Sequence, residues 1–456
     1  MDELSFPLPP SSRAPIVTCA LGAVSLCLIL LTLRRNTKRR ILPPGPTRLP
    51  LLGHLFHVPK ERGWERYHEL CRDIDFPRLI PAIGSDIIAL DVLGTTIIVL
   101  DSAEAVNELL ERRSHIYSNR PRLPMINELM GWEFNIGLMP YGDRWRAHRK
   151  DAGAVSTFHP QETEAARQLL LNLYHKPGDF ISHFRLMAGY VDAIHYLVEA
   201  AVPGAFLVDL IPVLKYIPDR TPFAYFKTFA KRSRDHTHQV RAAPYEEAKR
   251  NIIAALAAFV FAMMTHLEVQ RRAQAELDAV LAPDRSALPY ITALVKEVLR
   301  WKPIVPLAHF LNVEDEYKGY LLPAGSLVLG NAWYHGAILN DENLYPEPSV
   351  FKPERFLPSH PGGTPPCQDP DVAFGFGRRI CPGRFMALDT LWIAFALILS
   401  MYDISKYVDR NGNIDEPGYE PVSASLVFMP LPFKCSIRPR NDQAARFLAS
   451  LDTDTS

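Results

Sequence analysis

The spacing of hydrophobic residues changes along the chain and predicts which segments are strands and which are helices. Residues 87–92 and 96–100 are two β-branched runs on either side of a short turn around Gly94, which predicts a hairpin. Asp101 and Glu104 follow with the spacing of a capping box, so we expect a helix from there through Glu111. The body of the protein therefore begins with a small sheet.

Helical spacing dominates the middle of the chain, from about residue 161 to residue 302. Apolar residues there recur three and four positions apart, as in Ile252, Leu256 and Phe259, which places them on one helix face. A further apolar helix is expected at residues 386–399. The sequence contains no internal repeat, so we predict one large domain that is mainly α-helical with small β-sheets.

Short strands and a proline-rich stretch lie between these helices. The strands are expected at residues 317–322 and 326–329, around a turn at Pro323 and Gly325. Eight of the 40 prolines fall between residues 340 and 370. A long proline-rich stretch in a compact protein is usually functional or disordered. This one leads directly into a glycine-rich segment.

An uncharged segment near the amino terminus, residues 14–33, predicts a transmembrane helix. It has 20 positions, and at about 1.5 Å per residue a helix of that length spans the roughly 30 Å hydrocarbon layer. The main alternative is a cleavable signal peptide, which would have a shorter apolar core and a small-residue cleavage site. Instead, basic residues follow at 34–40, and the positive-inside rule then places the carboxyl-terminal bulk on the cytoplasmic side.

These features divide the chain into five parts. Pro43, Pro44 and Pro46 follow the basic residues and can neither continue a helix nor join a sheet interior, so they indicate a stiff linker. The predicted parts are an amino-terminal tail (1–13), a transmembrane anchor (14–33), a basic, proline-rich linker (34–50), a large catalytic domain (51–440) and a carboxyl-terminal tail (441–456).

Composition narrows the function of the large domain. The chain has 456 residues, of which 48% are hydrophobic, so a disordered chain is excluded. Its 50 Lys and Arg balance 50 Asp and Glu, which argues against a nucleic-acid partner. The six cysteines are scattered and form no CxxC pair, so neither a zinc site nor a disulfide framework is indicated.

One cysteine nevertheless lies in a specific pattern. Residues 374–383, FGFGRRICPG, place Cys381 in a turn ahead of a predicted helix. Glycines let the backbone approach a flat ligand, while a helix start and nearby arginines favour the thiolate, which can ligate haem iron. A single cysteine is more often an ordinary buried residue. The interpretation therefore depends on the whole pattern, which adds Phe374, Arg379 and Gly383 to the thiol.

With this pattern the chain resembles the cytochrome P450 family. The resemblance covers most of residues 14–120, then 131–150 and about 255–440. It implies a P450-like fold, a haem cofactor whose iron is held by Cys381, and a place for Phe374 in the cofactor-binding loop. The segments LPYITALVKEVLRW and VAFGFGRRICPGRFMALDTLWIA are similar to fungal enzymes of the O-methylsterigmatocystin-oxidoreductase-like type, which belong to secondary metabolism.

Further cofactor-binding residues follow from the same resemblance. Trp145 and Arg149 match the Trp-x-x-x-Arg helix of the family, whose side chains meet a haem propionate, and Arg379 is a second propionate candidate. His309 aligns with a histidine that often reaches the haem edge, although Phe310 replaces the arginine common beside it.

A second group of charged residues matches a structural feature of the family. Glu297 and Arg300 lie three positions apart, on one helix face, where an ion pair can form. Arg355 supplies the second arginine of the family's Glu-Arg-Arg network. Because breaking a buried network of this kind is strongly destabilising, we assign these three residues to folding and not to catalysis.

The oxygen-activating segment of the family is missing from its expected place. It normally contains a glycine and an acid followed by an alcohol, which deliver protons to bound oxygen. No glycine occurs between Gly204 and Gly319, and no acidic residue in that interval is followed directly by Thr or Ser. Thr265 lies too late to substitute, and residues 151–251 form a shorter section than usual. No catalytic residue is therefore assigned.

Three explanations are open for this gap. The segment is genuinely absent, the sequence derives from an incomplete transcript or a misjudged exon, or another side chain or the substrate's own hydroxyl relays protons. We favour an incomplete or alternative product of a monooxygenase gene. The resemblance to the family remains, because the thiolate loop is intact.

The resemblance implies a membrane-anchored haem-thiolate monooxygenase of the endoplasmic reticulum, with its catalytic domain in the cytoplasm. It would oxidise an apolar small molecule, such as a terpenoid or polyketide, with O2 and electrons from NADPH supplied through NADPH-cytochrome P450 reductase. Arg378, Arg379 and Arg384 form either a docking patch for that acidic reductase or ordinary solvated charge. The alternatives are a haem-binding protein without turnover and a membrane protein that no longer encloses haem.

Overall fold

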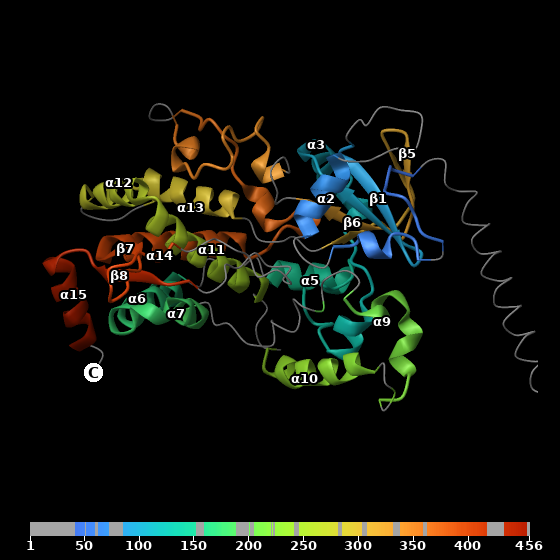
Figure 1. Cartoon of the computed structure of the whole chain (residues 1–456), viewed down its shortest axis with the longest axis horizontal. Helices are drawn as coiled ribbons and strands as arrows, with labels where there is room; N and C mark the ends of the chain where they lie inside the picture. The colour runs from blue at the N-terminus through green and yellow to red at the C-terminus, as the bar shows by residue number, and fades with distance from the viewer. Residues whose placement is uncertain are drawn as a thin grey trace, which may run out of the picture.

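The structure of the protein, a computed structural model, has a sheet-rich end and a helix-rich end (Figure 1). The predicted amino-terminal tail and transmembrane anchor lie outside the described residues, and so do residues 34–41 of the linker. The described residues are 42–50, 52–59, 63–72, 85–151, 159–187, 200, 205–219, 221, 224–240, 246–280, 285–302, 308–331, 338–358, 363–416 and 433–453.

The largest sheet has four strands in the order β1-β2-β6-β3. Strands β1 (Ile87–Val92) and β2 (Thr95–Leu100) form the predicted hairpin, with Gly94 in the turn at a φ of 89°. Strand β6 (Leu327–Gly330) runs parallel to β2, and β3 (His309–Phe310) runs antiparallel to β6. The sheet therefore joins the amino-terminal part of the body to the segment before the proline-rich stretch.

The helix after β2 starts differently from the prediction. Its N-cap is Ser102 and not Asp101, because the Ser102 hydroxyl accepts a hydrogen bond from the backbone N–H of Ala105. The Asp101 carboxylate is instead buried and hydrogen-bonds to the side chains of His68 and Asn331. Two neighbouring capping residues look alike in the sequence, and the tertiary partners of Asp101 decide between them.

Residues 317–322 form two strands and not one. Lys318 and Gly319 adopt positive φ angles of 50° and 79° and make a tight turn between β4 (Asp315–Tyr317) and β5 (Tyr320–Leu322). The single-strand prediction was wrong because Lys318 and Gly319, which interrupt the run of Tyr and Leu, reverse the chain through their left-handed backbone.

Three helices form the centre of the helix-rich end. Helix α11 (Glu246–Thr265) packs against α14 (Arg384–Met401), where the rings of Phe259 and Phe395 stack with centroids 3.9 Å apart. Helix α13 (Pro289–Trp301) packs against both. The other helical segments are η2 (Leu55–His57), α2 (Gly63–Arg72), α3 (Ala103–Val106), η3 (Asn107–Arg112), α4 (Ser114–Tyr117), η4 (Pro124–Leu129), α5 (Asp143–Asp151), α6 (His159–His175), η6 (Pro177–Asp179), α7 (Phe180–Met187), α9 (Leu207–Leu210), η7 (Pro212–Tyr216), α10 (Tyr225–Val240), α12 (Leu267–Asp278), η8 (Ile338–Asn340), η9 (Pro353–Phe356), η10 (Asp371–Phe374), η11 (Gly377–Arg379) and α15 (Asp442–Thr453).

The last part of the chain covers the helix-rich end. Strands β7 (Tyr402–Lys406) and β8 (Cys435–Pro439) pair antiparallel. The segment after residue 440, expected as a tail, forms α15, which buries Ala444 and Leu448 and packs against α6 and α14. These two residues lie four positions apart, so they share the face that turns to the core.

Within the described ranges, α14 is the only unbroken helix that is long and apolar enough to cross a membrane. It packs against α6, α11, α12 and α13 and carries eight buried residues. Its apolar composition is therefore explained by its place in the protein core.

Candidate haem-thiolate site

The glycine-rich segment forms a tight loop between η10 and α14. The backbone N–H of Cys381 donates a hydrogen bond of 2.8 Å to the carbonyl oxygen of Phe374, which closes the loop. The Arg384 N–H donates to the Cys381 carbonyl oxygen at 3.3 Å, where α14 begins. Cys381 and Phe374 are both 6% exposed. The thiol is thus held at a helix start inside the protein, as the pattern predicts.

Gly377 fixes this loop to the segment after β2. Its φ is 53°, and a Cβ atom at this position would lie 2.1 Å from the carbonyl oxygen of Leu110. Its N–H donates a hydrogen bond of 2.6 Å to a carboxylate oxygen of Glu111. Only glycine allows this approach, so the loop depends on both its own backbone geometry and η3.

Arg379 is buried beside the loop. Its guanidinium donates to the carbonyl oxygens of Ser118 and Met139, at 2.5 and 2.8 Å, and lies 4.6 Å from the ring centroid of Trp145. Trp145 is only 5% exposed and comes from α5. Two residues predicted to bind the cofactor therefore contact each other from separate elements.

Arg149, one turn after Trp145 on α5, reaches the same loop. Its guanidinium donates a hydrogen bond of 2.5 Å to the carbonyl oxygen of Ile380, the residue before Cys381. Burial and the neighbouring Arg384 lower the pKa of Arg149, whereas the negative charge of the Cys381 thiolate raises it. Arg149 thus links α5 to the residue before the proposed ligand.

His309 lies at the start of β3 and is 2% exposed. Its Nδ1 atom is 2.9 Å from the carbonyl oxygen of Tyr117. Burial lowers the pKa of His309 to about 3, and the positive charges of Arg120 and Arg379 act in the same direction. His309 is therefore neutral, and one ring nitrogen is used to hold the backbone before Arg120.

Arg120 belongs to this group of residues and was missed in the sequence. It is 8% exposed, and its guanidinium donates to the carbonyl oxygens of Gly137 and Ala308, both at 2.7 Å. Its only sequence signal is a basic residue directly before Pro121, which is a common pattern. The structure identifies it because it connects the segment before His309 to the loop before α5.

The Glu-Arg-Arg network is confirmed in the core near η9. One carboxylate oxygen of Glu297 lies 2.8 Å from Arg300 Nε and 3.0 Å from Arg355 Nε. All three side chains are buried, and the N–H of Lys352 also donates to Glu297. Arg355 further donates to backbone carbonyls of the proline-rich stretch, for example that of Pro346 at 2.7 Å. The network therefore fastens that stretch to α13.

Helix α11 ends at Thr265. Residues 252–264 are all buried, and Thr265 is the last residue of the helix. The Thr265 hydroxyl donates a 2.8 Å hydrogen bond to the carbonyl oxygen of Phe261, and the chain then bends by 105° into α12. The hydroxyl is therefore hydrogen-bonded within its own helix. This agrees with the interpretation that Thr265 lies too late in the sequence to relay protons.

The residues around Cys381 fit a haem. A buried thiol at a helix start supplies an iron ligand, and Arg120, Arg149 and Arg379 are cations suited to two propionates. The arginines converge on the backbone that surrounds the loop, and His309 adds a neutral ring at the same place. The site would therefore offer one thiolate ligand to the iron and several hydrogen-bond donors to the propionates.

Comparisons with known proteins identify the same pattern. A family model described as Cytochrome P450 matches residues 43–170 and 247–435. Cytochrome P450 monooxygenase 98 of Postia placenta is 37% identical, over 95% of this chain and 96% of that protein. Cytochrome P450 monooxygenase ple1 of Rhodocybe pseudopiperita is 36% identical over 90% and 92%. Tryptamine 4-monooxygenase of Psilocybe cyanescens is also 36% identical, over 90% and 95%.

The comparisons also show an unmatched middle segment and a relative that is longer than this chain. The family match stops at residue 170 and resumes at residue 247. The alignment with the Postia protein has 515 positions, 59 more than the 456 residues of this chain, so at least that many positions of the relative have no counterpart here. This agrees with the shortening predicted between residues 151 and 251.

Proposed function

Because the chain belongs to the cytochrome P450 family of haem-thiolate monooxygenases, we propose that it oxidises an apolar small molecule with Cys381 as the iron ligand. The haem, when bound, supplies the oxygen chemistry, and its electrons come from NADPH through a reductase. The substrate that we propose is a secondary metabolite such as a terpenoid or polyketide. The similarity of residues 288–301 and 372–394 to fungal enzymes of secondary metabolism supports this class.

The single observation that carries the proposal is the loop of Cys381. Backbone hydrogen bonds close it, Gly377 fits it against Leu110, and Arg149 donates to the residue before the thiol. A cysteine with only a packing role does not require a glycine in left-handed conformation four residues earlier. The arrangement positions a thiolate for a planar ligand.

The buried cations have a complementary role in this proposal. Arg149 and Arg379 would each donate hydrogen bonds to a propionate, with Trp145 holding the two guanidinium groups by its ring face. Arg120 would assist from the opposite side of the loop, and His309 would contact the haem edge as a neutral ring. Phe374 would pack beside the thiolate.

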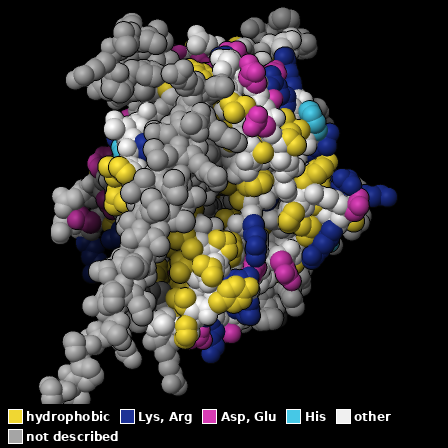
Figure 2. Space-filling model, turned by 90° about the vertical axis from the view of Figure 1, so that its right-hand side faces the viewer, with side chains coloured by type: hydrophobic (Ala, Val, Ile, Leu, Met, Phe, Trp, Pro, Cys, Tyr) yellow, Lys and Arg dark blue, Asp and Glu magenta, His cyan; other side chains and the backbone are white. Residues whose placement is uncertain are grey.

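An exposed apolar face supports attachment to a membrane. Phe56, Val213 and Tyr216 are 74%, 65% and 75% exposed. The segments that carry them adjoin, since Leu55 and Leu210 pack on the same hydrophobic cluster. Figure 2 shows hydrophobic side chains gathered on this side of the molecule, with Lys and Arg among them. This face fits the proposed location on the endoplasmic reticulum.

A basic surface beside the thiolate loop fits the proposed NADPH-cytochrome P450 reductase. Arg378 is exposed and donates to the hydroxyl of Tyr141, and Arg384 lies 4.1 Å from the ring centroid of the exposed Phe385. Several basic residues of α5 are also exposed. Arg379, in contrast, is buried and would serve the haem and not the docking surface.

A second candidate function is haem binding without efficient turnover. The unmatched residues 171–246 and the missing acid-alcohol segment support it. In that case the thiolate loop would still hold haem, but proton delivery to oxygen would be poor. The two candidates share the cofactor site and differ in oxygen activation.

The reduced protein with carbon monoxide tests the shared site. We expect the full chain in its membrane fraction to give the Soret band of thiolate-ligated haem, and Cys381→Ser to abolish that band. Cys367→Ser is the matched control, because Cys367 is a buried cysteine of the same hydrophobic cluster. Loss of the band in the control alone, or no haem in the wild type, would contradict the assignment.

Turnover separates the two candidates. With reductase and NADPH, an active monooxygenase forms an oxygenated product from a ligand that shifts the haem spectrum. NADPH oxidation that stays at background for every such ligand supports the impaired protein.

A further inference from the structure

Tyr141 connects the start of α5 to the loop of Cys381. Its backbone N–H donates a hydrogen bond of 3.0 Å to the side-chain carbonyl oxygen of Asn119, and its ring centroid lies 5.0 Å from that of Trp145. Trp145 is buried, whereas Tyr141 is half-buried. The phenol ring is thus held from the protein side, and its hydroxyl reaches an exposed residue, Arg378.

This hydroxyl holds the side chain of Arg378. The Nη1 atom of Arg378 donates a hydrogen bond of 3.0 Å to the Tyr141 hydroxyl oxygen, and its guanidinium carbon lies 5.7 Å from the centroid of the phenol ring. Arg146 also lies over this ring but pairs with Asp143. Arg378, in contrast, forms no ion pair with any residue that the structure describes.

A neutral acceptor fixes an arginine without cancelling its charge. A guanidinium has five N–H donors, so one hydrogen bond to a hydroxyl leaves the others for a carboxylate. Glu111, an acid beside this loop, is already hydrogen-bonded to the N–H of Gly377. Ordering a long side chain before binding also lowers the entropy that association costs. Arg378 is therefore prepared for a carboxylate of another molecule.

The position of this arginine indicates the kind of partner. Arg378 is in η11, three residues before Cys381. The same loop continues into the exposed Phe385, against which the guanidinium of Arg384 packs at 4.1 Å from the ring centroid. An acidic protein surface would meet positive charge and an apolar ring within one short segment, residues 378–385.

We infer that Tyr141 is a positioning residue for electron entry: its hydroxyl keeps the Arg378 guanidinium oriented to pair with a carboxylate of the reductase. This inference rests on the proposed function. It gives Tyr141 a role in docking, and not in holding the haem or in the oxidation step, because the hydrogen bond of its hydroxyl is made with Arg378.

Reduction of the haem by the reductase tests the inference without a substrate. The full chain and a full-length fungal NADPH-cytochrome P450 reductase would share phosphatidylcholine vesicles. The thiolate Soret band that forms with NADPH under carbon monoxide then gives a rate at each reductase concentration. Dithionite, which reduces haem without the reductase, reports in parallel whether each variant holds its haem.

The test variants are Tyr141→Phe, Arg378→Ala and the double variant. Tyr141→Phe removes the hydroxyl and keeps the ring beside Trp145. The double variant shows whether the hydroxyl acts through Arg378, because two residues that act through one contact do not give independent losses.

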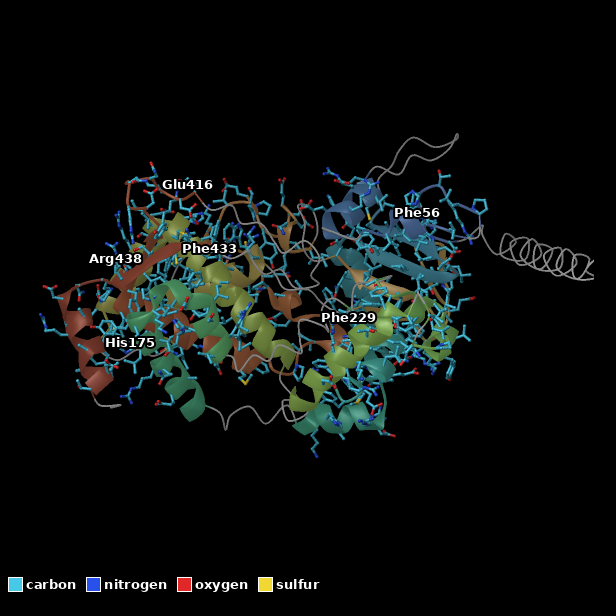
Figure 3. All side chains as sticks on the ribbon, turned by 60° about the horizontal axis from the view of Figure 1, so that its bottom comes forward. Phe56, His175, Phe229, Glu416, Phe433 and Arg438 are labelled. Atoms are coloured by element: carbon cyan, nitrogen blue, oxygen red, sulfur yellow. The ribbon has the colours of Figure 1, made fainter. Side chains whose placement is uncertain are left out.

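The matched controls lie at the helix-rich end. Tyr407→Phe changes a half-buried tyrosine whose ring centroid is 5.4 Å from the ammonium of Lys434, and Arg438→Ala removes an exposed arginine of β8. Figure 3 shows Arg438 at the opposite end of the molecule from Phe56, and Figure 1 shows β8 well apart from α5.

We expect Tyr141→Phe to raise the reductase concentration that gives half the maximal rate by about three- to fivefold. The maximal rate and the dithionite band should stay within about twofold. Arg378→Ala should raise the same concentration by about tenfold, and the double variant should match it. Both controls should behave as the wild type does.

Several results would overturn the inference. They are a change in the maximal rate alone, no change in either value for Tyr141→Phe, and losses that multiply in the double variant. A wild type that gives the thiolate band with dithionite but is not reduced at any reductase concentration would overturn it as well. Failure of the proposed function is distinguishable, because dithionite then gives no thiolate band.

Discussion

The regions before and after α11 are built in different ways. The thiolate region, formed by α13, η9, the loop of Cys381 and α14, has a buried ionic network and a loop closed by backbone hydrogen bonds. The shortened region, between α6 and α11, contains brief elements, such as α7 with 8 residues and α9 with 4. The family match covers the first without a break and leaves the second unmatched.

This difference separates two properties that are usually treated as one. In the proposed function, holding the haem depends on contacts within the thiolate region and on α5. Proton delivery and substrate contact would, in the same proposal, depend on the missing acid-alcohol segment and on the unmatched residues 171–246. A chain can therefore retain the cofactor site while its oxygen chemistry is impaired, and the following predictions test that separation.

The largest effect is expected from Glu297→Ala in the thiolate region. It leaves Arg300 and Arg355 buried without their shared carboxylate, so unfolding in urea should show a loss of about 3 to 5 kcal/mol. Glu316→Ala, at an exposed position of β4, is the control and should stay within about 0.5 kcal/mol. A loss below about 1 kcal/mol for Glu297→Ala would show that the network is not a main support of this region.

Restoring the shortened region should raise turnover. A helical segment with the glycine, acid and alcohol pattern of the family would be inserted before residue 246, where α11 begins. Because general acid–base catalysis contributes about 10² or more, product formation should rise by about that factor. The control insertion has alanine in place of the acid and the alcohol. Equal rates for both insertions would mean that another group already relays protons.

A matched pair of glycine substitutions compares the two regions directly. Gly377→Ala places a methyl group 2.1 Å from the carbonyl oxygen of Leu110 at a positive φ, so we expect about 1 to 3 kcal/mol of destabilisation and loss of haem. Gly178→Ala, in η6 with no atom within 4 Å of its added Cβ, should change stability by less than about 0.5 kcal/mol. The readouts are urea midpoints and the Soret band. Equal changes in urea midpoint and in the Soret band for the two variants would contradict the expected difference between the two regions.

The smallest effect is expected from Asp209 in α9. Its carboxylate accepts a 2.8 Å hydrogen bond from the N–H of Met125, and burial, with the nearby charge of Glu128, raises its pKa from 3.8 to about 7. Because the folded state holds this proton more tightly than the unfolded state, the carboxylate reduces stability progressively as pH rises from about 4 through 7.

Asp209→Asn should therefore stabilise the protein at pH 8, on the order of 1 to 2 kcal/mol, and change little at pH 4. Thermal unfolding at the two pH values measures this difference. Asp179→Asn, at an exposed position of η6, is the control and should not alter the pH dependence. A gain that is the same at both pH values would contradict a titrating Asp209.

Much of the candidate site was predictable because its residues occur in short motifs. The loop of Cys381, the pair Trp145 and Arg149, and the ionic network all have fixed spacing, and the structure brings the members of each together. Arg120 was not predictable, since its partners Gly137 and Ala308 lie far along the chain. The N-cap at Ser102 and the turn at Lys318 also needed tertiary information.

The sequence by itself determined the family, the thiol that would hold the haem, the mainly helical architecture and the absence of the usual acid-alcohol segment. These depend on local spacing and residue type, which a linear pattern records. Only the tertiary structure decided that Arg379 is buried beside the loop of Cys381 whereas Arg378 is exposed, and that Ser102 and not Asp101 caps the helix after β2. Burial and hydrogen bonding join segments that are distant in the chain, and no local pattern specifies them.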